Sequence, residues 1–423
     1  MIASLILTCS LIFFCSYLYG FTITRPKNFP PGPPNLPIWG GYWFLLMANY
    51  NFVHKAIDVL AKLYNSDIVG IFFGNTPVVH ITGYNLVKEA LTRDEFVGRC
   101  DIYVTRYRSM GELLGIAFND GDYWKEQRRF ALRHLRDFGF GRRFSLTEQL
   151  LESEVKSLIE FINSVPHPDD HDIHGKKGRV LIPDLFYGPL SNTILHMLVG
   201  KRFEDKELRT IARSILRFLR STDAAGRALN ITPWLRYFAP EYFEFSIIVS
   251  SQNLVEERKK TFSDDHYGDF MDTFLSKMQK LRNEAVILES LRMDPVIPVN
   301  TPRRCLKNTT LGGYEIPKDT TLLISLWNAN RDERVWKDPN VFKPERFLDD
   351  EGSLLKKDNI VSFGGGKRLC AGETFARQTI FLVLSGLLQN FTFEPVDGAP
   401  DLDGKKWGFV CDLPAFWVDA VSR

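Results

Sequence analysis

Residues 363–372, which read F-G-G-G-K-R-L-C-A-G, constrain this 423-residue chain more than any other segment. They place Cys370 among glycines, beside Lys367 and Arg368, and just before a helix-forming run that starts at Glu373. Nearby cations and a helix N-terminus stabilise a thiolate at neutral pH. Glycines let the backbone pass close to a large planar ligand and aim N–H groups at sulfur. The segment therefore predicts a functional thiolate, and a chance cysteine in a glycine-rich loop is the disfavoured alternative.

The pattern F-x-x-G-x-R-x-C-x-G resembles the haem-ligand loop of the cytochrome P450 monooxygenases, in which the cysteine is the axial iron ligand. Two other motifs follow in the order typical of that family. The tetrapeptide E-x-x-R, from Glu289 to Arg292, lies 81 positions before Cys370, and P-E-R-F, which contains Arg346, lies between them. The resemblance implies that Glu289, Arg292 and Arg346 form a buried ion network that locks the cysteine loop.

The resemblance also implies a haem cofactor, whose two propionates need cations. Trp124 and Arg128, in W-K-E-Q-R, place an indole N–H and a guanidinium on one helix face. Arg303 in T-P-R, Arg368 in the cysteine loop and Arg99 in F-V-G-R complete the implied propionate clamp. For Arg99, a solvated side chain is an equal alternative.

Composition agrees with one large haem domain over residues 25–423. The chain is 44% hydrophobic and 13% aromatic, and no linker divides it. A formal net charge of +2 argues against a nucleic-acid partner. The six cysteines form no C-x-x-C pair, which indicates a reducing compartment. We expect a mainly α protein with small β-sheets (α+β), which is the cytochrome P450 fold.

The first residues predict a membrane anchor over 1–24. Residues 2–21 carry no charge and are long enough to cross a bilayer. Without a preceding cation or a small-residue cleavage site, a removed signal peptide is disfavoured. Arg25 and Lys27 follow, which by the positive-inside rule keeps the rest in the cytosol. The prolines of 30–34 predict a stiff spacer. We therefore expect a single-pass protein of the endoplasmic reticulum membrane.

Periodicity predicts a helix-rich chain with short strands. A hairpin is expected over 68–81, around Gly74 and Asn75. Irregular structure is expected over 335–362. Helices are expected over 84–92, 122–136, 145–164, 184–199, 205–221, 241–262, 283–294 and 373–389, and strands over 303–306, 313–316 and 321–326.

Two polar clusters have competing interpretations. His167, His171 and His174, interleaved with aspartates, fit either a metal site or a solvated loop, and the surrounding Pro, Gly and charge favour the loop. A second cluster fits either a solvated helix face or, by the resemblance, a docking face for an acidic reductase. It comprises Lys125, Arg128, Arg129, Arg133, Arg136, Arg142 and Arg143.

One family feature is missing. The family carries a central helix over the distal haem face, and this helix relays protons during oxygen activation. Its motif is [A/G]-G-x-[D/E]-T-[T/S]. The nearest dipeptide here is Asp272-Thr273, but Phe and Met precede it. Trp124 and Glu289 are only 165 residues apart. We expect a helix of roughly 30 residues, ~45 Å long, to be missing near 279–281.

Two functions remain open. The first is a haem-thiolate monooxygenase that inserts one oxygen atom of O2 into a lipophilic small molecule. Its electrons come from NADPH through NADPH-cytochrome P450 reductase, with cytochrome b5 as a possible second partner. The stretch 126–142 is particularly similar to microsomal members from insects. The second is an inactive or misfolded variant of such an enzyme, which binds haem at most.

Overall fold

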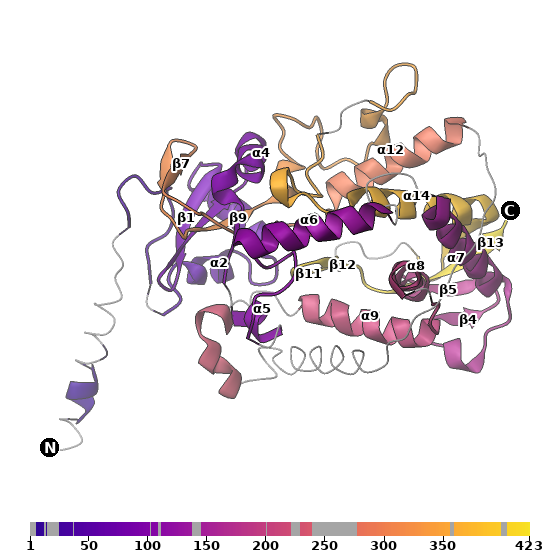
Figure 1. Ribbon diagram of the computed structural model, residues 1–423, viewed down its shortest axis with the longest axis horizontal. Helices are drawn as coiled ribbons and strands as arrows, with labels where there is room; N and C mark the ends of the chain where they lie inside the picture. The colour runs from indigo at the N-terminus through magenta and orange to yellow at the C-terminus, as the bar shows by residue number, and fades with distance from the viewer. Residues whose placement is uncertain are drawn as a thin grey trace.

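The computed structural model describes residues 6–11, 14, 25–36, 38–101, 103–108, 111–137, 145–199, 201–220, 229–238, 277–355, 359–398 and 404–423. A sheet-rich part lies toward the N-terminus and a helix-rich part lies beyond it (Figure 1). The described α-helices are α2 (Tyr42–Ala48), α3 (Val53–Leu63), α4 (Tyr84–Thr92), α5 (Tyr103–Arg108), α6 (Gly121–Asp137), α7 (Ser145–Asn163), α8 (Tyr187–Val199), α9 (Asp205–Arg220), α12 (Lys277–Met293), α13 (Leu326–Ala329) and α14 (Glu373–Asn390).

The larger sheet has the strand order β1-β2-β9-β6-β3. The predicted hairpin is confirmed, with Gly74 at a left-handed φ of +57° between its strands. β9 runs parallel to β2, with Val78 opposite Thr321, so a distant part of the chain completes this sheet. Its strands are β1 (Ile68–Phe73), β2 (Thr76–Ile81), β9 (Thr321–Ile324), β6 (Arg303–Arg304) and β3 (Gly98–Arg99).

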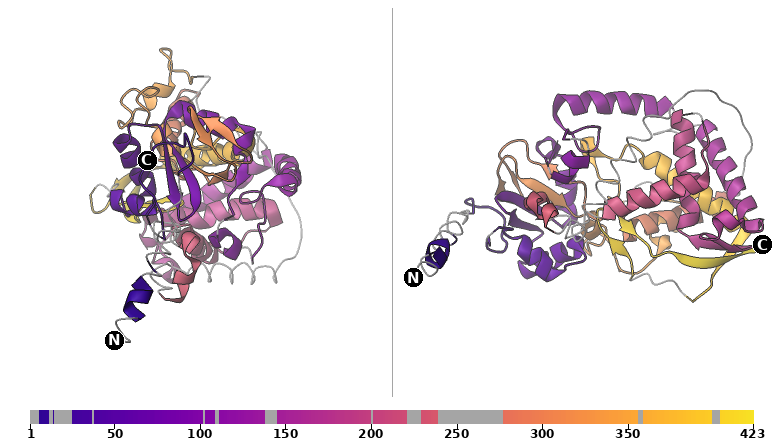
Figure 2. Two further views of the ribbon diagram at one scale, coloured as in Figure 1. Left: turned by 90° about the vertical axis from the view of Figure 1, so that its left-hand side faces the viewer. Right: turned by 90° about the horizontal axis from the view of Figure 1, so that it is seen from below.

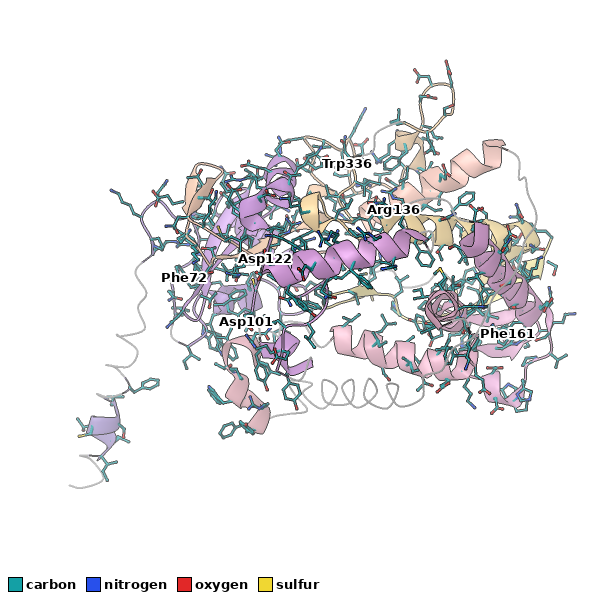
Figure 3. All side chains as sticks on the ribbon, in the orientation of Figure 1. Phe72, Asp101, Asp122, Arg136, Phe161 and Trp336 are labelled. Atoms are coloured by element: carbon teal, nitrogen blue, oxygen red, sulfur yellow. The ribbon has the colours of Figure 1, made fainter. Side chains whose placement is uncertain are left out.

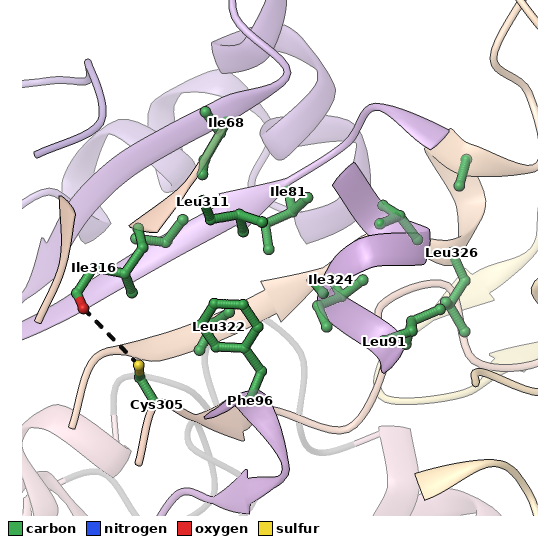
Figure 4. Close-up of a cluster of buried hydrophobic side chains, with 14 of the residues drawn as sticks. Ile68, Ile81, Leu91, Phe96, Cys305, Leu311, Ile316, Leu322, Ile324 and Leu326 are labelled. Carbon is green, nitrogen blue, oxygen red and sulfur yellow. Dashed lines mark hydrogen bonds between the residues drawn. The ribbon is translucent and has the colours of Figure 1, made fainter. Parts of the chain in front are cut away.

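A buried apolar cluster fixes helix α4 against this sheet. Ile81, Leu322 and Ile324 project from the sheet toward Leu91 and Phe96, which lie at and just beyond the end of α4 (Figure 4). The Cys305 thiol closes one side of the cluster, 3.9 Å from the carbonyl oxygen of Ile316. The short hairpin β7 (Thr309–Leu311) and β8 (Tyr314–Ile316) covers the same cluster. This packing makes α4 a rigid support for any loop that rests on it.

A second sheet, which the sequence analysis missed, closes the helix-rich part. Its order is β10-β13-β5-β4, and Val418 of β13 lies opposite Val180 of β5. The strands are short, and the pairing of β13 with β5 joins segments more than 200 positions apart, so no local pattern marks the sheet as a whole. A separate hairpin joins β11 (Lys406–Trp407) and β12 (Cys411–Asp412). The strands of the second sheet are β4 (His174–Lys176), β5 (Arg179–Ile182), β10 (Phe391–Pro395) and β13 (Phe416–Ser422).

The histidine-rich segment is exposed at His167 and His171, as the solvated-loop prediction expected, but not at His174. His174 begins β4, is fully buried, and has its ring centre 4.7 Å from that of Phe161 in α7. Burial lowers the pKa of His174, so this ring is neutral inside the fold. In the described ranges no group of His, Cys, Asp or Glu side chains is arranged to hold a metal ion. The aspartates bind α9 instead, in the pairs Asp169–Lys206, Asp170–Arg209 and Asp172–Arg213.

Most predicted helices are confirmed, two differ in where they begin, and one is not tested. The helix expected over 184–199 begins with a 3-10 turn at Asp184–Phe186, and α8 follows. The helix expected from 283 already begins at Lys277. Residues 279–281, where we expect the central helix to be missing, therefore lie within continuous α12. The helix expected over 241–262 lies outside the described residues. The strand expected over 303–306 ends at Arg304, whereas β8 and β9 lie within the predicted strands.

The proline segment is not only a spacer, because it packs along the edge strand β1. The Gly70 N–H donates to the Pro31 carbonyl at 2.8 Å. The Arg25 guanidinium donates to the carbonyls of Gly32 and Gly70, which binds this cation to the sheet. Most of residues 2–21 lie outside the described part. Among the helices that the structure describes, none has the length and apolar character to span a bilayer.

The contact of Gly32 with β1 generates a stability prediction. A Cβ at Gly32 would overlap the carbonyl oxygen of Gly70, so Gly32→Ala forces the proline segment away from the sheet. We expect a loss of about 1–3 kcal/mol in the free energy of unfolding, measured by urea denaturation. Gly175→Ala is the control, since its Cβ would meet nothing closer than 3.4 Å. Equal stability of the two variants would contradict the docking role.

Candidate functional site

The thiol of Cys370 lies at the mouth of a groove beside α6. Cys370 precedes α14, and its N–H donates to the Phe363 carbonyl at 3.0 Å, which closes the glycine loop. Its side chain is exposed. The groove has a volume of about 970 Å³, and Cys370, Trp124 and Arg128 are among its lining residues. The thiol at the N-terminal end of α14 is therefore open to a ligand.

Two glycines shape this loop for packing. Gly364 and Gly366 have left-handed φ values of +76° and +62°, which disfavour other residues. A Cβ at Gly366 would overlap the carbonyl oxygen of Leu91, in the last turn of α4. The sequence analysis assigned the glycines to a close ligand approach, but the Gly366 requirement comes from contact with α4. The loop thus rests on the rigid sheet-and-helix support.

The structure brings all the predicted clamp residues together. Arg99 on β3 lies opposite Arg303 on the neighbouring strand β6. The Arg368 guanidinium carbon stacks 3.6 Å from the centre of the Trp124 ring. Arg128, one turn along α6 from Trp124, donates to the Leu369 carbonyl at 2.6 Å, next to Cys370. We call Arg99, Arg128, Arg303 and Arg368 the arginine cluster.

The arginine cluster holds excess positive charge in a mostly buried place. Burial, and then repulsion from neighbouring arginines, lowers the pKa of Arg303 and of Arg368 to about 9. Burial lowers the pKa of Arg99 to about 10, and Arg128 adds to that effect. Asp120, which the sequence analysis missed, opposes the lowering at Arg99 and Arg368. Such a concentration of charge favours an anionic ligand.

Two buried donors of the site lack acceptors. Trp124 Nε1 and Arg303 Nε are both buried without a hydrogen-bond partner. The other donors partly hold the local fold, since Arg303 Nη1 donates to the Leu91 carbonyl at 2.8 Å and Arg99 Nε to that of Ala117 at 2.7 Å. Buried donors without acceptors cost stability, so a bound oxygen acceptor would be favourable. The clamp residues fit a group that carries carboxylates.

The predicted ion network is confirmed. The side chains of Glu289 and Arg292 are fully buried and form two hydrogen bonds of 2.7 and 2.8 Å. Arg346 reaches Glu289 at 3.1 Å, and the Lys343 N–H donates to it at 2.8 Å. Burial alone would raise the pKa of Glu289, but these donors hold it below its usual value. The carboxylate is thus kept charged inside the fold.

The basic residues of α6 form an exposed face. Arg129, Arg133 and Arg136 are exposed. Asp122 lies near one end of α6 and Arg136 near the other end (Figure 3). Seen from below, α6 lies along an edge of the molecule (Figure 2). Trp124 is the only buried side chain among those described in α6. Lys125 is exposed as well and Arg128 is half-buried, whereas Arg142 and Arg143 lie outside the described residues.

Comparison with known proteins gives one family. The model of the family described as "Cytochrome P450" matches residues 30–285 and 283–416. The chain is 28% identical to "Farnesoate epoxidase" of Bombyx mori, over 93% of this chain and 95% of that protein. It is 28% identical to "Probable cytochrome P450 305a1" of Drosophila melanogaster, over 90% of this chain and 93% of that protein. It is 27% identical to human "Cytochrome P450 2J2", over 88% and 87%.

The burial of the ion network predicts a large effect of removing one member. Arg292→Leu leaves Glu289 buried with one cation fewer, and we expect a loss of about 3–5 kcal/mol in the free energy of unfolding. Arg334→Leu is the control, because Arg334 also pairs with two carboxylates but its side chain is 62% exposed. That variant should lose only about 0–1 kcal/mol. Similar losses in urea denaturation would refute the structural role of the network.

Proposed function

Because this chain belongs to the cytochrome P450 family, we propose that it is a haem-thiolate monooxygenase that inserts one oxygen atom of O2 into a lipophilic small molecule. The main support is the exposed thiol of Cys370, which shares one groove with Trp124 and Arg128. Haem, when bound, supplies the iron chemistry of oxygen activation, tuned by its thiolate ligand. The chain's own residues then have three tasks, which are to bind the haem, to hold its ligand loop and to receive electrons.

We assign the binding task to Cys370 and the clamp residues. The Cys370 thiolate would bind the haem iron, and its place at the N-terminal end of α14 suits an anionic ligand. Trp124 Nε1 and Arg303 Nε are the buried donors without partners, and a propionate oxygen would satisfy them. Arg99, Arg128 and Arg368 supply the compensating positive charge. Burial, and then repulsion from the neighbouring arginines, lowers the pKa of Arg368 to about 9, and a bound anion would relieve that repulsion.

We assign the receipt of electrons to the exposed basic face of α6. Arg129, Arg136 and Lys367 line the groove that contains Cys370, and Arg133 is exposed on the same helix. A positive face steers an acidic partner toward this side of the molecule. The proposed partner is NADPH-cytochrome P450 reductase, with cytochrome b5 as a second candidate. Electrons would thus arrive on the side of the molecule where the proposed ligand lies.

We further propose a location in the endoplasmic reticulum membrane, with a single-pass anchor over 1–24 and a cytosolic haem domain. An exposed apolar surface supports membrane contact near the anchor. Trp43 and Met47 of α2 are 37% and 68% exposed, and Trp234 and Phe238 are 52% and 79% exposed. The two segments adjoin, because Trp39 Nε1 donates to Thr232 Oγ1 at 3.1 Å. Aromatic side chains of this kind favour a membrane interface.

A second candidate function, a variant without effective oxygen activation, has its own support. The family model matches in two segments that meet at 283–285. The alignment with the Bombyx protein spans 484 positions, more than the 423 residues of this chain, so that protein has residues that this chain lacks. Large apolar side chains are exposed on four helices, namely Phe130 of α6, Ile194 of α8, Ile215 of α9 and Ile380 of α14. We infer that a central helix is missing near 279–281.

The ligand assignment predicts a spectroscopic result. The reduced carbon-monoxide complex of the haem-loaded chain should show thiolate-type absorption. Cys370→Ala should abolish it, because Cys370 carries the only thiol among the described residues that line the groove. Cys411→Ala is the control, since Cys411 lies on β12 and is held by the Val296 carbonyl. Retention of the thiolate-type absorption by Cys370→Ala would eliminate Cys370 as the ligand.

The missing helix predicts weak catalysis by this chain. In the family that helix supplies the proton relay, and positioned proton transfer contributes about 100-fold or more to a rate. Product formation driven by NADPH and reductase should therefore be at least about 100-fold lower than in a version with a central helix inserted at 279–281. Equal loading with haem in both proteins is the control. Comparable substrate oxidation would exclude the proposed deletion effect.

A further inference from the structure

The side chain of Asn330 connects the buried ion network to the start of the cysteine loop. Asn330 follows α13 and is fully buried. Its carbonyl accepts a hydrogen bond from Arg292 Nη1 at 2.8 Å, so its backbone is held by the network. Its Oδ1 accepts from the Val361 N–H at 3.1 Å, and its Nδ2 donates to Ser362 Oγ at 2.8 Å. Asn330 thus contacts both the buried ion network and the start of the cysteine loop.

The contacts around Asn330 form a closed circuit. The Ser362 hydroxyl donates to the Leu291 carbonyl at 2.6 Å, and Leu291 is the neighbour of Arg292 in α12. Because a backbone N–H can only donate, the Val361 N–H fixes which end of the Asn330 carboxamide is the oxygen. The amide nitrogen then faces Ser362. A satisfied, buried circuit of this kind allows one arrangement and disfavours others.

The circuit holds the residues from which the cysteine loop is built. The Gly364 N–H donates to the Val361 carbonyl at 2.8 Å, and the Cys370 N–H donates to the Phe363 carbonyl at 3.0 Å. The position of Cys370 therefore depends on the position of 361–363. Within the described chain, no hydrogen bond of Glu289, Arg292 or Arg346 reaches residues 361–372. The ion network acts on the loop only through other groups.

We propose that the Asn330 carboxamide is the positioning residue through which the buried ion network fixes the cysteine loop. Arg292 holds the backbone of Asn330, and its side chain holds Val361 and Ser362. The inference rests on the proposed function only for the spectroscopic consequence, because the mechanical link is a property of the chain itself. This role of Asn330 differs from general stabilisation of the fold, because loss of its side-chain hydrogen bonds should affect residues 361–372 in particular.

Asn330→Leu isolates this link. Leucine has a similar size, and the backbone carbonyl that accepts from Arg292 remains, so the ion network stays intact. The substitution removes the acceptor of the Val361 N–H and the donor to Ser362. Asn328→Leu is the matched control, because Asn328 lies in α13 two residues before Asn330. Its Nδ2 donates to Asp58 of α3 at 2.8 Å, and its Oδ1 accepts from Ser325 at 2.6 Å. Both variants lose two side-chain hydrogen bonds.

The test is amide hydrogen exchange of the full chain, read by mass spectrometry on peptides that cover 359–372. We expect exchange there to be at least about tenfold faster in Asn330→Leu than in the unsubstituted chain, and unchanged in Asn328→Leu, because a local opening becomes easier. Melting temperatures of the two variants should be similar. Ser362→Ala should reproduce part of the effect, and adding it to Asn330→Leu should add little. Equal exchange at 359–372 in both asparagine variants would overturn the inference.

The haem-loaded proteins provide a second measurement. The fraction of the reduced carbon-monoxide complex with thiolate-type absorption should fall in Asn330→Leu and remain unchanged in Asn328→Leu. If the unsubstituted chain lacks that absorption, the assignment of Cys370 as ligand fails, and the exchange result still decides the role of Asn330. An unchanged fraction together with unchanged exchange would overturn the positioning role.

Discussion

The rest of the site depends on the pairing of the buried Glu289 carboxylate with its hydrogen-bond donors. It is fully buried and receives donors from Arg292, Arg346 and the Lys343 backbone. A charge in such a place is tolerated only when it is fully paired, so the segments that carry these donors have one compatible arrangement. The pairing joins α12 to the irregular stretch beyond α13. Through Asn330, it also determines where the cysteine loop begins.

The proposed haem site combines a rigid support with an unsatisfied charge. Gly366 rests on the last turn of α4, and the Cys370 N–H closes the loop onto Phe363. Around the loop, the arginine cluster collects positive charge that Asp120 offsets only in part. The positive charge of the arginine cluster is therefore not fully balanced by the acidic side chains around it. Its complement is a ligand with carboxylates, which matches the group that the family binds through a thiolate.

The proposed deletion affects packing more than it affects the ligand loop. The ion network, the loop and the arginine cluster use residues from 99–128 and 289–370, which the structure places together. By contrast, α6, α8, α9 and α14 expose large apolar side chains. We therefore infer that the proposed deletion removes the features that activate oxygen and leaves in place those proposed to bind haem. Binding and turnover are separate questions for this chain.

The sequence by itself determined most of the helices and the E-x-x-R and P-E-R-F pairing, and it predicted a ligand loop around Cys370, because those signals are local in spacing or period. It identified Trp124, Arg128, Arg303 and Arg368 as clamp residues, and the structure brings them together with Arg99.

Only the tertiary structure decided the second sheet, the burial of His174 and the link through Asn330. Each of these depends on partners distant in sequence, such as Val180 with Val418, and side-chain hydrogen bonds between distant segments leave no periodic pattern. An asparagine after a short helix is ordinary in sequence, and it becomes a positioning residue only where folding encloses it between Arg292 and Val361.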